Sequence, residues 1–175
     1  MKIVFGLGNK GEEYKNTRHN AGAIVCNLAE KKLDNIKVKF LYPETFMNES
    51  GKVARKYIKE KKDLKNFVVV YDDMDLPMGK IKISFDRSSG GHNGLENIIK
   101  AVKSQEFVRI RIGVSGATVK GVAKKPKGEE KVLKFLLGEF KKEELEILKK
   151  ESKKVAEAIE VIFTEGYQKA MTLYN

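Results

Sequence analysis

The sequence predicts a single α/β domain of three layers, in which helices cover both faces of a mixed, mostly parallel, twisted central sheet. Short apolar segments of β-prone residues alternate along the chain with segments whose apolar residues recur at helical spacing. The chain of 175 residues also has the length of one ordinary domain. We therefore expect residues 1–175 to form one unit, with parallel strands at the centre of the sheet and an antiparallel strand at its edge.

Each element is predicted from a local pattern. Short apolar runs predict strands at residues 2–7, 37–42, 67–71, 80–85 and 107–114. Apolar residues at three-to-four spacing predict helices at 20–31, at 50–58 with Ser50 as the cap, at 95–102, and in a tail covering 145–162. The connections predict an acidic turn at 72–79, a flexible loop at 88–94 and a mobile basic loop at 115–130.

Composition excludes several classes of protein. No apolar run reaches the roughly 20 residues of a membrane-spanning helix, and the chain has no apolar leader after Met1, so we expect a cytoplasmic protein. The single cysteine, Cys26, excludes an internal disulfide and a cysteine-built zinc site, and its apolar neighbours indicate a core position. The net charge of +11 favours a polyanionic partner, although it is also typical of the solvated surface of a protein from a hot environment.

The glycines Gly6, Gly8 and Gly11 follow the first predicted strand with the spacing of a dinucleotide-binding fingerprint. In that fingerprint a helix begins at the third glycine, so that its N-terminus receives the pyrophosphate. Here a polar stretch follows instead, and the helical pattern begins only near Asn20. The sequence therefore disfavours a nucleotide cofactor.

The two histidines of the chain, His19 and His92, both lie in polar loops that contain glycine, and each precedes an asparagine. An imidazole beside a neutral amide suits proton transfer and substrate positioning, while a local turn contact is the alternative. Asp72 ends the strongest predicted strand. It is the natural partner of a histidine, since a carboxylate that accepts one imidazole N–H leaves the other nitrogen free as a base.

The other acidic residues of this connection, Asp73 and Asp75, are expected to cap or solvate the turn. A magnesium site formed by Asp72, Asp73 and Asp75, with nuclease or phosphotransferase activity, is a less favoured alternative. No G-x-S-x-G motif is present, and Cys26 lies within a helical pattern, so the sequence gives no support for a covalent nucleophile.

Three asparagines, Asn9, Asn48 and Asn93, occur in loop or helix-start contexts. Each could be a helix cap when taken separately. Together they would supply uncharged amide groups that can hold a peptide backbone and a developing oxyanion.

These motifs resemble the bacterial-type peptidyl-tRNA hydrolase family over nearly the whole chain. The matching segments are Gly-Leu-Gly-Asn near the start, Tyr14, Thr-Arg-His-Asn-Ala-Gly, Thr-Phe-Met-Asn-x-Ser-Gly, Asp-x-x-Asp-Leu-Pro, Gly-Gly-His-Asn-Gly-Leu, and Arg-x-Arg-Ile-Gly at 109–113. The resemblance implies hydrolysis of the ester between a peptide and the 3′-terminal ribose of tRNA, which recycles tRNA from stalled or aborted translation. It also implies a monomer that needs neither a cofactor nor a metal.

The resemblance implies a role for each matched residue. His19 would be the base that activates water, Asp72 its orienting carboxylate, and Asn9 the group that steadies the scissile carbonyl or its oxyanion. The implied substrate-binding residues are Tyr14, Phe46, Met47, Asn48, His92 and Asn93.

The implied tRNA contacts depart from the family pattern at one position. Arg111 matches the residue that helps to clamp the 5′-phosphate, but Ser84 replaces the lysine that usually completes the clamp. Lys82 and Arg87 are the candidates to replace it, and Lys120 lies in the basic region that corresponds to the family's lid over the cleft.

The alternative from another class is a non-catalytic RNA-binding protein on the same fold, like the splicing-factor relatives of plant organelles. The presence of His19, Asp72 and all three asparagines disfavours it.

Overall fold

The computed structural model describes residues 1–117 and 120–175 and has the three-layer α/β architecture that the sequence predicts. The strands are β1 (Ile3–Gly6), β2 (Lys39–Leu41), β3 (Phe67–Pro77), β4 (Ile81–Phe85), β5 (Val108–Ala117) and β6 (Ala123–Lys124). The helices are α1 (Ala21–Glu30), α2 (Ser50–Tyr57), α3 (Asn93–Val102), α4 (Glu129–Leu136), α5 (Lys142–Thr164) and α6 (Tyr167–Tyr174).

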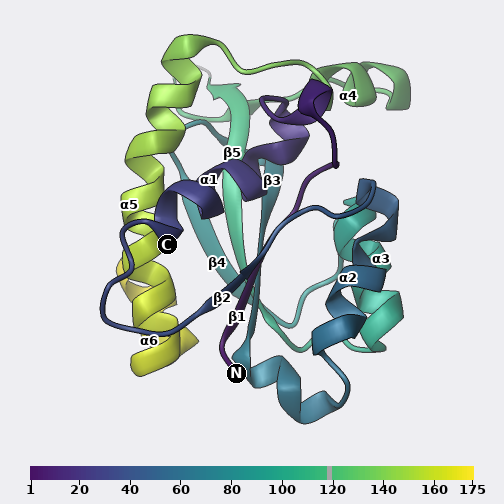
Figure 1. The fold of residues 1–175 in the computed structure, drawn as a ribbon. Helices are drawn as coiled ribbons and strands as arrows, with labels where there is room; N and C mark the ends of the chain where they lie inside the picture. Colours follow the sequence, from purple (N-terminus) through teal and green to yellow (C-terminus); the bar gives the residue numbers. More distant parts are fainter. Residues whose placement is uncertain (118–119) are drawn as a thin grey trace.

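In the described residues the sheet has the order β2-β1-β3-β5-β4, with β6 paired to the end of β5. The pairings among β2, β1, β3 and β5 are parallel, whereas β4 is an antiparallel edge strand, which confirms the predicted mixed sheet. Because parallel strands end at the same edge, residues that follow β1 and β3 are brought together there. Helix α4 crosses above this end of the sheet (Figure 1).

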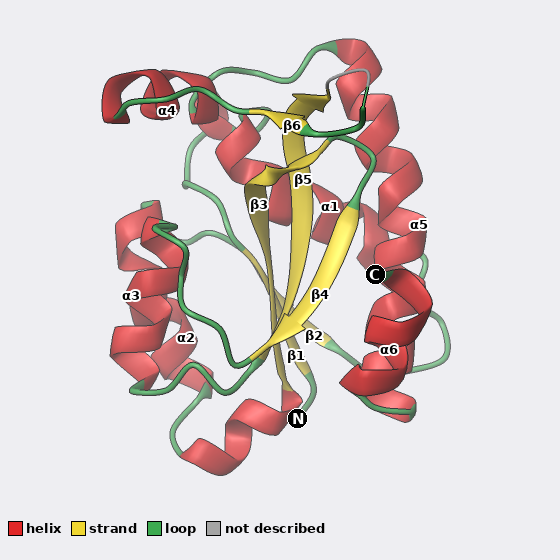
Figure 2. Ribbon diagram, turned by 180° about the vertical axis from the view of Figure 1, so that it is seen from behind, coloured by secondary structure: helices red, strands yellow, loops and turns green. Residues whose placement is uncertain are grey.

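Two apolar cores lie on the two faces of the sheet. Helices α1, α5 and α6 pack on one face and helices α2 and α3 on the other, as the two opposite views show (Figures 1 and 2). Alternate residues of each strand point to opposite faces, so Val70 of β3 enters the first core and Val69 the second. Cys26 is fully buried in the first core, which confirms its predicted position, and burial raises the pKa of its thiol.

Strand β3 is longer than the sequence predicts. Residues 72–79 were expected to form a turn, but the strand continues to Pro77, and its pairing with β5 is irregular between Asp73 and Pro77. Within this stretch Asp73 Oδ1 accepts the backbone N–H of Asp75 at 2.8 Å, which is a contact that acidic turn residues commonly make. The predicted turn was therefore wrong because turn-forming residues occupy an irregular part of a strand.

The described parts of the segment 115–130 contain short regular elements at both ends. Strand β5 continues to Ala117 and pairs with β6, and α4 begins at Glu129, while residues 118–119 lie outside the described residues. A two-residue strand is too short to give a periodic signal, which explains why the sequence pattern did not indicate it.

The starts of two helices bear on the functional predictions. Two short 3₁₀ turns, Glu12–Tyr14 and Arg18–Asn20, separate β1 from α1, so the first α-helix begins at Ala21 and not at Gly11, as expected. Ser50 was expected to cap α2, but it is the first residue of the helix and Glu49 is the cap. The Ser50 hydroxyl donates to the carbonyl of Met47 at 2.8 Å.

Helix α1 approaches the sheet closely at Gly22. A Cβ at this position would lie 2.1 Å from the carbonyl oxygen of Val70 in β3, so only glycine fits. The same oxygen accepts the N–H of Leu7 at 2.9 Å, and the Leu7 carbonyl accepts the N–H of Ala23 at 3.0 Å. These contacts hold the start of α1, and the turn Arg18–Asn20 before it, at the carboxyl ends of β1 and β3.

In the described part of the chain, no helix combines the length and the apolar character that crossing a membrane requires.

Candidate active site

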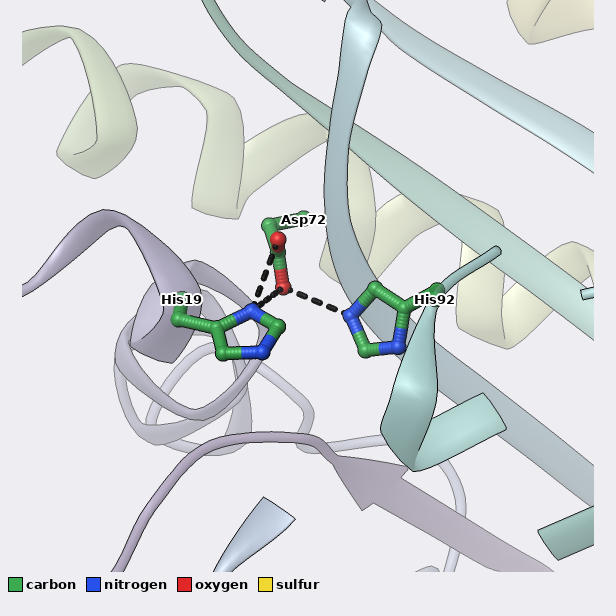
Figure 3. Close-up of side chains that lie close together, drawn as sticks. All are labelled: His19, Asp72 and His92. Atoms are coloured by element: carbon green, nitrogen blue, oxygen red, sulfur yellow. Dashed lines mark hydrogen bonds and ion pairs between the residues drawn. The ribbon is translucent and has the colours of Figure 1, made fainter. Parts of the chain in front are cut away.

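Asp72 of β3 contacts both histidines of the chain (Figure 3). His19 Nδ1 lies 3.0 Å from each carboxylate oxygen, and His92 Nε2 lies 2.9 Å from Oδ1. His19 and Asp72 are buried, and the imidazole rings of the two histidines lie 4.9 Å apart between their centroids. The structure thus brings together the predicted pair of His19 and Asp72, and it adds a contact of Asp72 with His92 that the sequence did not indicate.

The two histidines present different nitrogens to this carboxylate. His92 is the N-cap of α3, and its Nδ1 accepts the backbone N–H of Leu95 at 3.2 Å. In its neutral form His92 therefore carries its proton on Nε2 and donates it to Asp72. His19 donates from Nδ1, and its Nε2 makes no hydrogen bond with a described residue. Only His19 retains a nitrogen that is free to accept a proton.

The charges of the site follow from this contact. Burial of His19 opposes its protonation, but the charge and the hydrogen bond of Asp72 outweigh burial and raise the pKa of His19 above its ordinary value. Burial likewise opposes ionisation of Asp72, but the two imidazoles outweigh it and hold the pKa of Asp72 well below its ordinary value. The carboxylate therefore stays ionised at neutral pH.

Tyr71, the residue before Asp72, was not predicted from the sequence. Its ring packs edge-on against His92, with 4.9 Å between ring centroids, and burial raises its pKa to about 12. The position of Tyr71 at the end of the strongest strand was the signal that could have indicated it.

Asn9 is held rigidly next to the turn that carries His19. Its side-chain oxygen accepts the N–H of Met47 at 2.7 Å, which leaves the amide N–H₂ of Asn9 without a described acceptor. Asn20, directly after His19, grips the backbone of Asn9 from both sides, since it accepts the Asn9 N–H at 2.8 Å and donates to the Asn9 carbonyl at 3.0 Å. The sequence reasoning missed this role of Asn20, for which its place beside His19 was the available signal.

The other predicted substrate-binding residues lie along the same end of the sheet. Asn48 and Asn93 are exposed, Met47 is buried, and Phe46 is exposed with its ring edge-on to Tyr14 at 6.3 Å between centroids. The start of α3 contacts the turn Met47–Glu49, so the segments that carry Asn48 and Asn93 are neighbours.

A cavity of about 500 Å³ opens beside the two histidines. Four of the predicted catalytic and substrate-binding residues line it, namely His19, Asp72, His92 and Asn93. Its walls come from the loop 87–91, from the end of β3 and from α4, which contributes Glu129, Val132, Leu133 and Leu136. Asn9, Asn48 and Phe46 lie outside this cavity.

The predicted basic residues occupy different places. Arg111 lines the cavity, but its Nε donates to Asp73 at 2.5 Å. Lys82 is exposed and lies directly opposite Arg111 in the β4–β5 pairing, so the two side chains share one face of the sheet. Arg87 is exposed and lines the cavity, whereas Lys120 is exposed and does not.

Strand β5 presents one arginine rather than two. Arg109 and Arg111 alternate with apolar residues in the sequence, which indicates that the strand presents both arginines, but Arg109 is fully buried. Its guanidinium lies 4.6 Å from the ring centroid of Phe107 and donates to the carbonyl of Gln105 at 3.1 Å. Arg109 thus belongs to the interior of the domain.

The three aspartates of the alternative magnesium site do not converge. Asp72 contacts the two histidines, Asp73 pairs with Arg111, and the exposed Asp75 pairs with Lys125. Within the described residues, the one group of His, Cys, Asp or Glu side chains close enough to share an ion is His19, Asp72 and His92. Both imidazole nitrogens that face Asp72 in this group are already hydrogen-bonded to it.

Comparisons with known proteins agree with this geometry. The family model described as "Peptidyl-tRNA hydrolase" matches residues 3–175. The chain is similar to the peptidyl-tRNA hydrolases of Carboxydothermus hydrogenoformans, with 39% identity over 100% of this chain and 98% of the relative, and of Fervidobacterium nodosum, with 40% identity over 99% and 95%.

Solved structures show the same fold. The crystal structure of peptidyl-tRNA hydrolase from Acinetobacter baumannii is similar to this chain with a TM-score of 0.82 and 27% identity, covering 100% of this chain and 94% of that one. Family model, full-length relatives and fold coincide, and therefore the chain belongs to the peptidyl-tRNA hydrolase family and is a carboxylic ester hydrolase.

Proposed function

We propose that His19 is the general base of the peptidyl-tRNA hydrolase activity and that Asp72 orients it. The observation that carries this proposal is the hydrogen bond from His19 Nδ1 to the buried carboxylate, because it fixes the tautomer and leaves Nε2 available beside the cavity. General-base catalysis requires such a nitrogen within reach of the attacking water.

In this mechanism Nε2 of His19 takes a proton from water as the water oxygen attacks the carbonyl carbon of the ester. The tetrahedral intermediate then expels the 3′-oxygen of the terminal ribose, which receives the proton from the imidazolium. The products are a peptide with a free carboxyl group and a tRNA with a free 3′-hydroxyl. Asp72 stabilises the transient imidazolium without itself becoming protonated.

Asn9 is the proposed donor to the oxyanion. Its side-chain oxygen is occupied by Met47, so the unpartnered N–H₂ is the group that remains to donate. The two contacts of Asn20 with the Asn9 backbone keep this amide in place. A preorganised donor of this kind stabilises the transition state because no rearrangement is needed as charge develops.

The remaining residues are assigned to substrate binding. Asn48 and Asn93 are exposed amides that can bind the peptide main chain, and Tyr14 and Phe46 offer apolar rings to the terminal adenosine or the peptide. Met47, which is bound to Asn9, and His92, which lines the cavity, are assigned to the lining of the peptide cleft. Both nitrogens of His92 are engaged, so we assign it to holding Asp72 rather than to donating to the substrate.

Basic residues on the β4–β5 face are assigned to the tRNA backbone. Arg111 and Lys82 lie opposite each other on one face, and Lys82 takes the place of the missing clamp lysine at the 5′-phosphate. Arg87 at the cavity wall and Lys120 are further contacts of the same kind.

The segment 115–130 is proposed to act as a mobile lid together with α4. Leu133 and Leu136 of α4 line the cavity, and Lys125 pairs with Asp75 at the end of β3. Movement of this segment would open the cavity to a peptide without disturbing the buried pair of His19 and Asp72.

The active unit is proposed to be a monomer in the cytoplasm; the monomer is supported by His19, Asp72, His92 and Asn9, which form the site within one chain. Sedimentation of the purified chain tests this state, and a dimer at micromolar concentration would contradict it.

The decisive experiment is hydrolysis of N-acetyl-aminoacyl-tRNA by the wild type and by His19→Ala, each with and without a chelator. We expect release of the N-acetyl amino acid by the wild type, unaffected by the chelator, and severe loss in the variant. Chelator-sensitive turnover would contradict the metal-free mechanism, and binding of tRNA without release would indicate the RNA-binding alternative.

A further inference from the structure

The turn that carries His19 is joined to the junction between α4 and α5. The backbone N–H of Arg18 donates to the carbonyl of Gly138 at 3.0 Å, and the N–H of Phe140 donates to the carbonyl of Asn16 at 2.9 Å. Between them lies an isolated antiparallel bridge of Thr17 with residue 139. Two segments more than a hundred residues apart in sequence therefore run side by side at this end of the sheet.

The side chain of Arg18 reinforces this junction. Its Nη2 lies 3.1 and 3.0 Å from the two carboxylate oxygens of Glu144, and its Nη1 donates to the carbonyl of Glu139 at 2.9 Å. The guanidinium also lies 4.8 Å from the ring centroid of Phe135 and 5.4 Å from that of Phe140. Only 13% of the Arg18 side chain is exposed, so these contacts are shielded from solvent.

Glu144 is fixed independently of Arg18. Its Oε2 accepts the backbone N–H of Lys141 at 2.7 Å, in the capping box at the start of α5. The hydrogen bond to Lys141 thus orients the Glu144 carboxylate without any contribution from Arg18. A planar guanidinium with several donors matches such a partner better than the single ammonium group of lysine does.

This arrangement attaches one guanidinium to two parts of the active site. Arg18 directly precedes His19 in the chain, and the junction that it binds directly follows α4, which walls the cavity. We propose that Arg18 is a positioning residue for ester hydrolysis: by clamping the α4–α5 junction through Glu144, it fixes His19 against Asp72. The proposal rests on the assignment of His19 as the base.

The test compares Arg18→Met, Arg18→Lys and Glu144→Gln with a matched control, Arg55→Met. Arg55 also uses its guanidinium to close a chain segment, since Nη1 donates to the carbonyls of Ile58 and Lys59 at 2.8 and 3.1 Å, but it lies in the last turn of α2 and outside the cavity lining. We expect kcat of Arg18→Met to fall about ten- to hundredfold with a smaller change in KM, because a small misplacement of the base lowers the rate of the chemical step. Arg18→Lys and Glu144→Gln should show a smaller fall in kcat than Arg18→Met. Arg55→Met should lower Tm without changing kcat.

A second measurement follows the geometry without relying on turnover. Because His19 and His92 are the two histidines of the chain, NMR titration resolves two imidazoles. Asp72 and His92 are the titratable side chains that contact His19. If Arg18→Met loosens the contact of His19 with Asp72, the midpoint of the His19 titration should fall.

The outcomes separate this proposal from the proposed function. An unchanged His19 titration and an unchanged kcat in Arg18→Met, with only a lower Tm, would overturn the positioning role. If Arg18→Met does not fold, kcat and the His19 titration of Arg18→Lys and Glu144→Gln test the positioning role instead. Full activity of His19→Ala would instead overturn the base assignment, whereas the titration of His19 in the Arg18 variants would still test the clamp.

Discussion

His19 and His92 share one carboxylate, yet their environments prepare them for different tasks. His19 donates to Asp72 from Nδ1 and keeps Nε2 free, whereas His92 donates from Nε2 and uses Nδ1 to cap α3. Both imidazoles stabilise the same anion, so the contact with Asp72 alone does not identify the base. The second nitrogen of each ring identifies the base, because a general base needs a ring nitrogen that is not already hydrogen-bonded to a protein group.

The largest effect is expected from His19→Ala. Loss of the free Nε2 removes general-base catalysis, which typically contributes about 10²–10⁴-fold, so kcat/KM should fall by at least that amount. Single-turnover hydrolysis of N-acetyl-aminoacyl-tRNA measures the loss, and circular dichroism checks the fold. A rate within a few-fold of the wild type would show that His19 is not the base.

The next largest effect is expected from Asp72→Asn, with a fall in kcat of about 10²-fold or more because the ring loses its orienting anion. Asp72 raises the pKa of His19, so wild-type kcat/KM should increase with pH through a value above the ordinary 6.5 of histidine, as His19 loses its proton. In the variant this acid limb should move to lower pH. The pH profiles of both proteins measure this, and an unmoved limb would contradict the assignment.

The same raised pKa affects stability with the opposite pH dependence. A group whose folded pKa is raised contributes stability below its unfolded pKa and loses that contribution as pH increases through the folded value. The difference in free energy of unfolding between wild type and His19→Ala should therefore shrink from pH 6 to pH 9.

A third prediction concerns a substitution that is expected to displace His19 but not His92. Gly22→Ala places a Cβ 2.1 Å from the Val70 carbonyl, so the start of α1 must shift and carry the His19 turn with it. We expect a loss of about 1–3 kcal/mol in stability and about tenfold or more in kcat. Urea denaturation and steady-state kinetics measure both, and the NMR chemical shifts of the His92 ring are the internal control. Wild-type values for stability and kcat would show that the close approach is not needed.

A smaller effect is expected from His92→Ala, since Asp72 keeps its contact with His19. We expect a fall in kcat of up to about tenfold and a loss of about 1 kcal/mol from the missing helix cap. His92→Asn is the matched variant, because asparagine restores the cap but does not restore the imidazole contact. If His92→Asn and His92→Ala were equally unstable, the cap would not be the source of the loss.

The smallest effect is expected from Lys82→Ala, which touches neither histidine. The variant should raise KM a few-fold with kcat unchanged and should flatten the salt dependence of tRNA binding, since one phosphate contact is lost. Binding measured over a salt series tests this, with the exposed Lys100 on α3 as the control position. An unchanged slope would remove Lys82 from the phosphate site.

Local patterns were sufficient to predict much of the fold and part of the site. The alternation of apolar strands and amphipathic helices predicted the three layers, and the apolar run before Asp72 attached this aspartate to a central strand, although the strand continues beyond it to Pro77. Because ligand sites lie beyond the carboxyl ends of parallel strands, His19 and Asp72 could be paired before any coordinates were known. These inferences use periodicity and strand order, which are properties of the chain itself.

Other features depend on which segments meet, and the sequence missed them. The contact of His92 with Asp72 requires the start of α3 to lie beside β3. The hydrogen bonds between Asn20 and the backbone of Asn9 require the loop after β1 and the turn before α1 to pack against each other. The irregular end of β3 read as a turn because Asp73 makes a turn-like hydrogen bond within a strand. The burial of Arg109 was missed because alternation in a strand does not indicate which face a neighbouring loop covers.

The sequence by itself determined the fold class and the family and indicated the groups that we propose perform the chemistry, because these depend on residue types and their spacing. Tertiary structure alone decided which histidine has a ring nitrogen without a hydrogen-bond partner among the described residues. It also decided that the side-chain oxygen of Asn9 is occupied, so that its N–H₂ group remains to donate. Both are settled by hydrogen bonds between segments far apart in the chain, such as Met47 to Asn9 and His19 to Asp72. A buried polar group takes whichever partner the packing brings within about 3 Å, and this proximity is a property of the folded domain.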